Sequence, residues 1–320
     1  MPIISQSSYQ PHWPFTNPHV QTVFPTLFRK VTGVRYRRER IETPDGDFID
    51  LDFSETAADK AVVILHGLEG DSSRNYVLGM VKAFNQSGRD AVAMNFRGCS
   101  GECNGKLRFY HSGDTADLHT VVTHLSEQYR YSQVALIGFS LGGNVVLKYL
   151  GERGDSVLPE IRKAAAFSVP CDLASSSNRI SEPSNRIYLK RFLRMLRKKI
   201  RMKMQVMPDF IDDRGYETIR SFKEFDDRYT APMNGFKNAE DYWEKSSCKP
   251  FLTSIAVPTI LISAADDPFL PDSCYPRMEA LENPFLSLEI PGHGGHVGFV
   301  AFTEQGRYWS ESRAVEFVNA

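Results

Sequence analysis

Residues 133–150 read QVALIGFSLGGNVVLKYL. An apolar, strand-like run leads into G-x-S-x-G at Gly138–Gly142, and a helix-like segment follows. This strand–turn–helix order presents the hydroxyl of Ser140 at a helix N-terminus, where the helix dipole and free N–H groups favour a developing negative charge. A side chain at Gly138 or at Gly142 would collide with the adjoining strand and helix. The pattern predicts a nucleophilic serine, although G-x-S-x-G alone also fits a glycine-rich turn with an incidental serine.

Short apolar runs recur on both sides of this motif, and helically spaced segments follow them. The runs are 61–65, 91–95, 133–138, 164–169, 259–263 and 286–290. This alternation indicates βα units and a mainly parallel sheet with both faces covered. No phosphate-loop pattern follows any run. We expect an α/β fold of about eight strands, preceded by a hairpin over 34–54 that turns at Pro44-Asp45-Gly46. A helix containing Leu118 and Val121 is expected to pack on the sheet, with Ser112 or Asp114 as its N-cap.

The βα rhythm is interrupted between Cys171 and Lys249 by roughly eighty residues, far more than an ordinary connection. We therefore expect one domain over 1–320, with its core in 1–170 and 250–320 and a helical cap inserted at about 171–249.

Within the insertion, residues 186–203 read RIYLKRFLRMLRKKIRMK and contain no acidic residue. Four apolar residues recur at helical spacing, so one face is apolar and the others are cationic. They are Leu189, Leu193, Leu196 and Ile200. One interpretation is a lid helix over the active site with a solvated outer face. The other is peripheral contact with an anionic membrane through Arg186–Lys203.

The composition limits the class of protein. The chain has 320 residues, of which 42% are hydrophobic and 24% charged, as in globular proteins. A net charge of -1 gives no overall attraction to nucleic acid. Five scattered cysteines predict no disulfide framework, and Cys99 and Cys103 lack the further ligands of a zinc site. We expect a cytoplasmic protein, because there is no signal-peptide pattern and no bilayer-spanning apolar run. We also expect that it needs no metal or cofactor.

A second motif, His66-Gly67-Leu68-Glu69-Gly70, follows the predicted strand 61–65. In folds with such a serine turn, this loop supplies a backbone donor that faces the nucleophile. We predict an oxyanion hole formed by the backbone N–H groups of Leu68 and Leu141. His66 is expected to be a buried support of the loop, because the base of this fold comes late in the chain.

The acid and base of a serine triad should follow Ser140 in the order acid, then histidine. The histidines after Ser140 are His293 and His296. Strand 259–263 leads into Asp266-Asp267, and D-x-x-x-P from Asp267 to Pro271 favours Asp267 as the acid, with Asp266 as support. Asp172, which follows an earlier strand, is an alternative acid.

With these motifs in place, the chain resembles family 4 of the AB hydrolase superfamily, the YheT-like α/β-hydrolases. The likeness covers almost the whole chain, although Pro18 stands where family members usually have glycine. Further matching segments are 17–22, 66–70, 95–101, 110–118 and 242–243.

The resemblance implies an α/β-hydrolase fold, favours His296 over His293 as the base, and implies a triad of Ser140, Asp267 and His296 that cleaves carboxylic acyl esters. Some relatives pass the acyl group to an alcohol, and eukaryotic relatives carry an N-terminal membrane anchor. The alternatives to an ester hydrolase are an acyltransferase and a non-catalytic ligand-binding protein of this fold.

Overall fold

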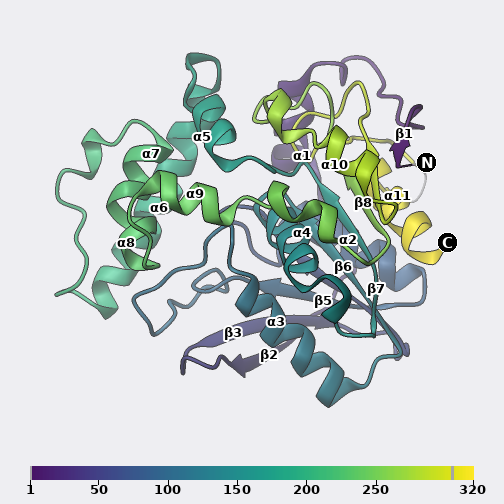
Figure 1. Cartoon of the computed structure of the whole chain (residues 1–320), viewed down its shortest axis with the longest axis horizontal. Helices are drawn as coiled ribbons and strands as arrows, with labels where there is room; N and C mark the ends of the chain where they lie inside the picture. Colours follow the sequence, from purple (N-terminus) through teal and green to yellow (C-terminus); the bar gives the residue numbers. More distant parts are fainter. Residues whose placement is uncertain (1, 304–305) are drawn as a thin grey trace.

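The computed structural model describes residues 2–303 and 306–320. Within these ranges, nine strands form one sheet in the order β1-β9-β8-β7-β6-β4-β5-β3-β2 (Figure 1). The strands are β1 (Ile3–Ile4), β2 (Arg37–Glu42), β3 (Phe48–Ser54), β4 (Lys60–Leu65), β5 (Asp90–Asn95), β6 (Gln133–Phe139), β7 (Ile161–Phe167), β8 (Thr259–Ile262) and β9 (Leu286–Glu289). Strand β3 pairs antiparallel with β2 and β5, and the other neighbours are parallel. The predicted α/β class is confirmed.

The main helices cover both faces of the sheet, and some of them lie in the long stretch of sequence between β7 and β8. They are α1 (Pro18–Phe28), α2 (Asn75–Gln86), α3 (Thr115–His124), α4 (Leu141–Arg153), α5 (Leu173–Ser181), α6 (Arg186–Val206), α7 (Phe222–Phe225), α8 (Ala231–Met233), α9 (Ala239–Ser246), α10 (Arg277–Glu282) and α11 (Trp309–Asn319). One apolar core joins the sheet to α3, α4 and α10, and a second joins its other face to α2 and α11. Burial on both faces explains why the parallel strands are uninterrupted apolar runs.

The predicted hairpin is confirmed as β2–β3, and its turn is closed by a hydrogen bond from Gly46 N to Thr43 O of 2.8 Å. Strand β1 was missed. Two residues near the N-terminus, Ile3 and Ile4, pair with β9 at the sheet edge, and the chain ends lie on the same side of the molecule (Figure 1). A two-residue edge strand carries no periodic pattern by which a sequence could reveal it.

Residues 168–258, which we name the helical insertion, connect β7 to β8 and contain α5 to α9. Helices α5 to α9 gather to one side of the sheet (Figure 1). Helix α6 confirms the predicted periodicity, since Leu189, Leu193, Leu196 and Ile200 are buried in a separate apolar core with Phe222 and other aromatic residues of the insertion. Among the residues that the structure describes, no helix combines the length and apolarity needed to cross a bilayer.

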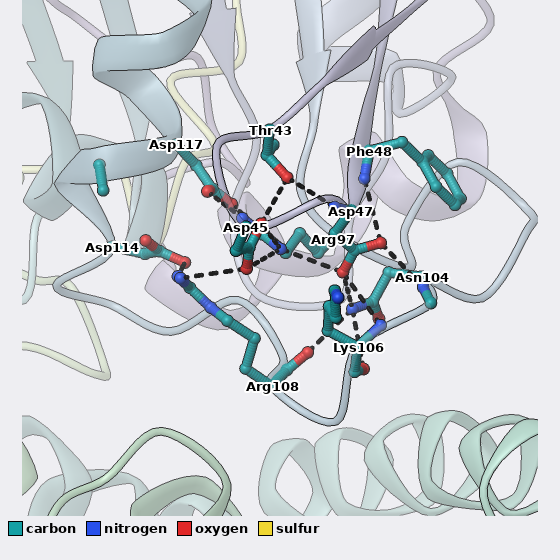
Figure 2. Close-up of polar contacts among 12 residues, drawn as sticks. Thr43, Asp45, Asp47, Phe48, Arg97, Asn104, Lys106, Arg108, Asp114 and Asp117 are labelled. Atoms are coloured by element: carbon teal, nitrogen blue, oxygen red, sulfur yellow. Dashed lines mark hydrogen bonds and ion pairs between the residues drawn. The ribbon is translucent and has the colours of Figure 1, made fainter.

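A buried guanidinium organises the loop that follows β5 (Figure 2). Arg97 donates to both oxygens of Asp117 at 2.7 Å, and its Nη1 pairs with Asp45 and Asp47 at 2.9 and 3.0 Å. These contacts tie the hairpin turn, the loop and the start of α3 together. Asp114 occupies the N-cap position of α3, and its carboxylate accepts from Arg108 at 2.7 Å. The predicted N-cap position is therefore confirmed for Asp114, although its carboxylate binds an arginine outside the helix.

Candidate active site

Ser140 lies between β6 and α4 in a strained turn, with φ 51° and ψ -116°. A Cβ atom on Gly138 would lie 2.5 Å from the carbonyl oxygen of Gly142, and one on Gly142 would lie 2.5 Å from that of His66. Both neighbouring atoms belong to the backbone and have little freedom to move. Glycine is therefore required at both positions, and the turn is held by a hydrogen bond from Ser140 N to Phe167 O of 2.8 Å.

His296 links Ser140 to Asp267 through both nitrogens of its ring. Its Nε2 lies 2.9 Å from Ser140 Oγ, and its Nδ1 lies 2.9 Å from Asp267 Oδ2. The Asp267 side chain is fully buried, and its other oxygen accepts from Phe269 N at 2.9 Å. Since a carboxylate only accepts, Nδ1 carries the proton and Nε2 is free to accept from the serine hydroxyl.

The alternative acids and the alternative base lie elsewhere. Asp266 accepts from Gly295 N at 2.9 Å and pairs with His293 at 3.2 Å, so this second pair braces the loop that carries His296. Asp172 caps α5 by accepting from Ser175 N and Ser175 Oγ. Neither arrangement places a second carboxylate on His296.

The loop 294–300 is held by an N-terminal segment whose role the sequence did not disclose. Thr22 of α1 accepts a hydrogen bond from His296 N at 2.9 Å, and Gln21 accepts one from Val300 N at 2.9 Å. A Cβ on Gly295 would lie 2.4 Å from the carbonyl oxygen of Pro18, so α1 packs directly on this backbone. The motif at 17–22 thus supports the histidine. Pro18 fits as the first residue of α1, where its missing N–H is harmless.

One backbone donor in the loop after β4 has no protein acceptor within residues 2–303 and 306–320. Gly67 N, Glu69 N and Gly70 N each donate to a protein acceptor, whereas Leu68 N has no such partner among the described residues. Leu141 N begins α4 and therefore has no acceptor within the helix. Both Leu68 and Leu141 line the cavity that contains Ser140.

His66 is buried beneath this loop and holds it by hydrogen bonds. Burial lowers its pKa to about 4, so the ring is neutral. Its Nε2 accepts from Phe96 N at 3.2 Å, which leaves Nδ1–H to donate to Gly67 O at 2.8 Å. The ring therefore fixes the peptide that precedes Leu68.

Two cavities meet at Ser140 and His296. The first runs beneath the helical insertion and is mostly apolar, with walls that include Ile180, Phe192, Phe222, Trp243 and Leu270. The second is more polar and lies between α1, the start of α2 and α6, and it is lined by Thr22, Arg74, Asn75, Tyr188 and Arg191 among others. A molecule bound at Ser140 can thus extend one part into an apolar space and the other into a polar one.

Over residues 2–303 and 306–320, no cluster of three or more His, Cys, Asp and Glu side chains is placed to hold a metal ion. The five cysteines are free thiols.

Known proteins match this chain over most of its length. A family model described as alpha/beta hydrolase fold matches residues 60–301. YheT of Escherichia coli strain K12 is 36% identical over 98% of this chain and 94% of its own. Human phospholipase ABHD3 is 29% identical over 93% of this chain and 75% of its own, and yeast monoacylglycerol lipase is 31% identical over 89% of this chain and 64% of its own.

Solved structures agree on the fold. The Pyrococcus furiosus esterase Pf2001 superposes with a TM-score of 0.60 at 20% identity, covering 91% of this chain and 97% of its own. From the family model and the identity to YheT together, this chain belongs to the α/β-hydrolase family and, within it, to the YheT-like hydrolases.

Proposed function

We propose that the protein is a serine hydrolase that cleaves carboxylic acyl esters, with Ser140 as nucleophile, His296 as general base and Asp267 as the acid that orients the imidazole. The observation that carries this proposal is the continuous chain of contacts from Ser140 Oγ through both ring nitrogens to a buried carboxylate. Relatives named as a phospholipase and a monoacylglycerol lipase support ester hydrolysis in general.

The reaction proceeds in two steps. Ser140 Oγ attacks the ester carbonyl carbon while its proton passes to His296 Nε2. The tetrahedral oxyanion accepts hydrogen bonds from the backbone N–H groups of Leu68 and Leu141. His296 then protonates the departing alcohol and leaves an acyl group on Ser140. In the second step His296 takes a proton from water and the hydroxide attacks the acyl carbonyl. The bond between the acyl carbon and Ser140 Oγ then breaks, His296 returns the proton to Ser140 Oγ, and the carboxylic acid is released.

The two cavities divide the ester between them. The acyl chain lies in the first cavity because its walls are mostly apolar, and burying each methylene is favourable by about 0.8 kcal/mol. The alcohol portion lies in the second cavity, beside Arg74 and Arg191. Residues of about 171–249, within the helical insertion, act as a cap over a core formed by residues 1–170 and 250–320, and this cap sets the length of acyl chain that fits.

We also propose that the outer face of α6 contacts anionic membrane. The predicted cationic face is smaller than its sequence indicated, because Lys199 is buried and Arg197 and Arg201 both pair with Asp213. The exposed cations of α6 that form no ion pair among the described residues are Arg186, Lys190, Arg191, Arg194 and Lys198. Exposed apolar residues lie close by, on α6 and on α1, which meet where His19 contacts Tyr188. They are Val23, Leu27, Phe28 and Ile187.

This surface borders the second cavity, since Val23 and Arg191 also line that cavity. A cationic face with apolar side chains beside it is the composition of helices that lie in a lipid interface. An ester substrate dissolved in a bilayer would thus reach Ser140 without crossing water.

The proposed activity is tested by labelling with a fluorophosphonate probe and by hydrolysis of p-nitrophenyl esters of increasing acyl length. Ser140→Ala should abolish labelling and lower kcat by ~10³-fold or more. Ser312→Ala, which removes an exposed serine of α11, is the matched control and should change neither. Product analysis with added alcohol separates hydrolysis from acyl transfer. Labelling that persists in Ser140→Ala would refute the assignment of the nucleophile.

A further inference from the structure

Helix α6 inserts two lysines into the core of the molecule, one helical turn apart. Lys199 is 7% exposed and Lys203 is fully buried. Burying an ammonium group is unfavourable unless it gains hydrogen bonds or an opposite charge. The partners of the two lysines therefore show what each one holds in place.

Lys203 holds the loop that follows β5. Its Nζ donates to Asn104 O at 2.9 Å, to Asn104 Oδ1 at 2.7 Å and to Lys106 O at 2.5 Å. Asn104 is in turn fixed by Asp47, which is part of the Arg97 network (Figure 2). This lysine docks α6 onto the Arg97 network and, in the part of the chain that the structure describes, makes no hydrogen bond to the loop that carries Leu68.

Lys199 instead reaches the loop that carries the Leu68 N–H group. Its Nζ lies 3.1 Å from Glu69 Oε1 and donates to Gly98 O at 3.0 Å and to Cys99 Sγ at 2.8 Å. Both side chains of the Lys199–Glu69 pair are less than a tenth exposed. The ammonium also lies 4.9 Å from the centre of the Tyr110 ring. Glu69 thus interacts with a cation that comes from the helical insertion.

Glu69 directly follows Leu68 and has an unfavourable backbone conformation, with φ 52°. Non-glycine residues keep such a conformation only where the surrounding structure enforces it. Here Tyr110 accepts from Glu69 N at 2.8 Å and donates to Glu69 Oε1 at 2.7 Å. Tyr110 and Lys199 together restrain the residue on the C-terminal side of Leu68, while His66 restrains the peptide before it.

We propose that Lys199 is a positioning residue that acts through Glu69 to aim the Leu68 N–H group at the oxyanion. The inference rests on the function proposed above. Its consequence is that the oxyanion hole is complete only while α6 is docked, so the helical insertion contributes to the chemical step as well as to the acyl cavity. The alternative is that Lys199 merely docks α6, as Lys203 does.

A double-mutant cycle separates these explanations, with p-nitrophenyl butyrate as substrate. Lys199→Met should lower kcat by about 10- to 100-fold with little change in KM, because misplacing a group in an active site by about 1 Å costs up to ~10²-fold. Glu69→Ala should give a similar loss, and the double variant should lose no more than either single variant. Lys199→Gln keeps a donor for Glu69 and should fall between wild type and Lys199→Met. Lys203→Met is the matched control and should change kcat by less than about 3-fold.

Amide hydrogen exchange over residues 66–70 gives a readout that requires no turnover. Lys199→Met and Tyr110→Phe should speed exchange in this segment, and Lys203→Met should not. Equal kcat losses in Lys199→Met and Lys203→Met, losses that multiply in the double variant, or unchanged exchange in Lys199→Met would each overturn the positioning role. If the wild-type protein hydrolyses no ester, the proposed function fails, while hydrogen exchange still tests the coupling of α6 to the loop.

Discussion

Asp226 gives the sharpest test of how the helical insertion is built. It lies on a π-helical turn, Asp226–Thr230, in the wall of the apolar first cavity. Its oxygens accept from Thr230 Oγ1 at 2.5 Å and from Trp243 Nε1 at 2.9 Å. No cation contacts this carboxyl group among the described residues. Burial therefore raises its pKa from 3.8 to about 7.

The raised pKa makes stability depend on pH. As pH rises above 3.8 the unfolded chain releases the Asp226 proton, while the folded protein keeps it until about pH 7. The folded state therefore loses stability across this window, by at most about 4 kcal/mol in total. Asp226→Asn keeps the shape of the side chain and an acceptor for Trp243 but cannot ionise. The variant should gain stability relative to wild type by about 3 kcal/mol between about pH 5 and about pH 8.

Equilibrium urea unfolding at the two pH values measures this difference directly. Asp227→Asn is the neighbouring control. Despite partial burial, Lys223 and Ala239 N hold the pKa of Asp227 below 3.8, so its contribution is fully present in this range and should not vary. In the intact enzyme, KM for long acyl esters should rise above about pH 7 in wild type and stay level in Asp226→Asn, because a carboxylate in the acyl cavity repels an apolar chain. An unfolding free-energy difference that stays constant within about 0.5 kcal/mol across this pH range would refute the reasoning.

Three further predictions follow from the site and its surroundings. Asp267→Asn should lower kcat by up to ~10⁴-fold, because the amide no longer selects the required tautomer of the histidine; a loss below about 10-fold in steady-state hydrolysis would contradict the triad. Gly142→Ala places a Cβ atom 2.5 Å from a backbone carbonyl oxygen and should lower the free energy of unfolding by about 1–3 kcal/mol, whereas Gly292→Ala, which meets nothing within 4 Å, should be nearly neutral in thermal unfolding. Lys190→Gln and Arg194→Gln should each weaken co-sedimentation with phosphatidylglycerol vesicles by about fivefold at low salt, and binding that is indifferent to both would exclude the membrane contact.

The local sequence pattern was enough to predict the parallel strands of the sheet and the order in which the candidate nucleophile, acid and base follow one another along the chain. Apolar runs over 91–95 and 133–138 correspond to β5 and β6. They are recognisable because parallel strands that are buried on both faces are apolar at every position. The two-residue strand β1 could not be found in this way, since its pairing with β9 depends on a contact between opposite ends of the chain. The N-cap position of Asp114 was predicted, but its ion pair with Arg108 was not, because that arginine lies outside the helix.

The residues of the candidate site could be predicted where they lie in a tight turn that only glycine can occupy at particular positions. Gly138 and Gly142 are needed next to the serine for reasons that the local sequence already contains. The support of the histidine was not predictable, because Thr22 and Gln21 lie more than 270 positions away from the loop that they hold.

The sequence by itself determined the strand–turn–helix that exposes Ser140, the βα order of the sheet and the amphipathic spacing of α6, since each depends on sterics or periodicity within a few neighbouring residues. Tertiary structure alone decided which cations of α6 remain exposed and which reach inward, as Lys199 does to Glu69. The choice between His296 and His293 rested on the family resemblance, and the tertiary structure places His296 beside the serine and His293 beside Asp266. These outcomes depend on which distant groups share a low-dielectric interior, where a charge must find a partner or lose its proton.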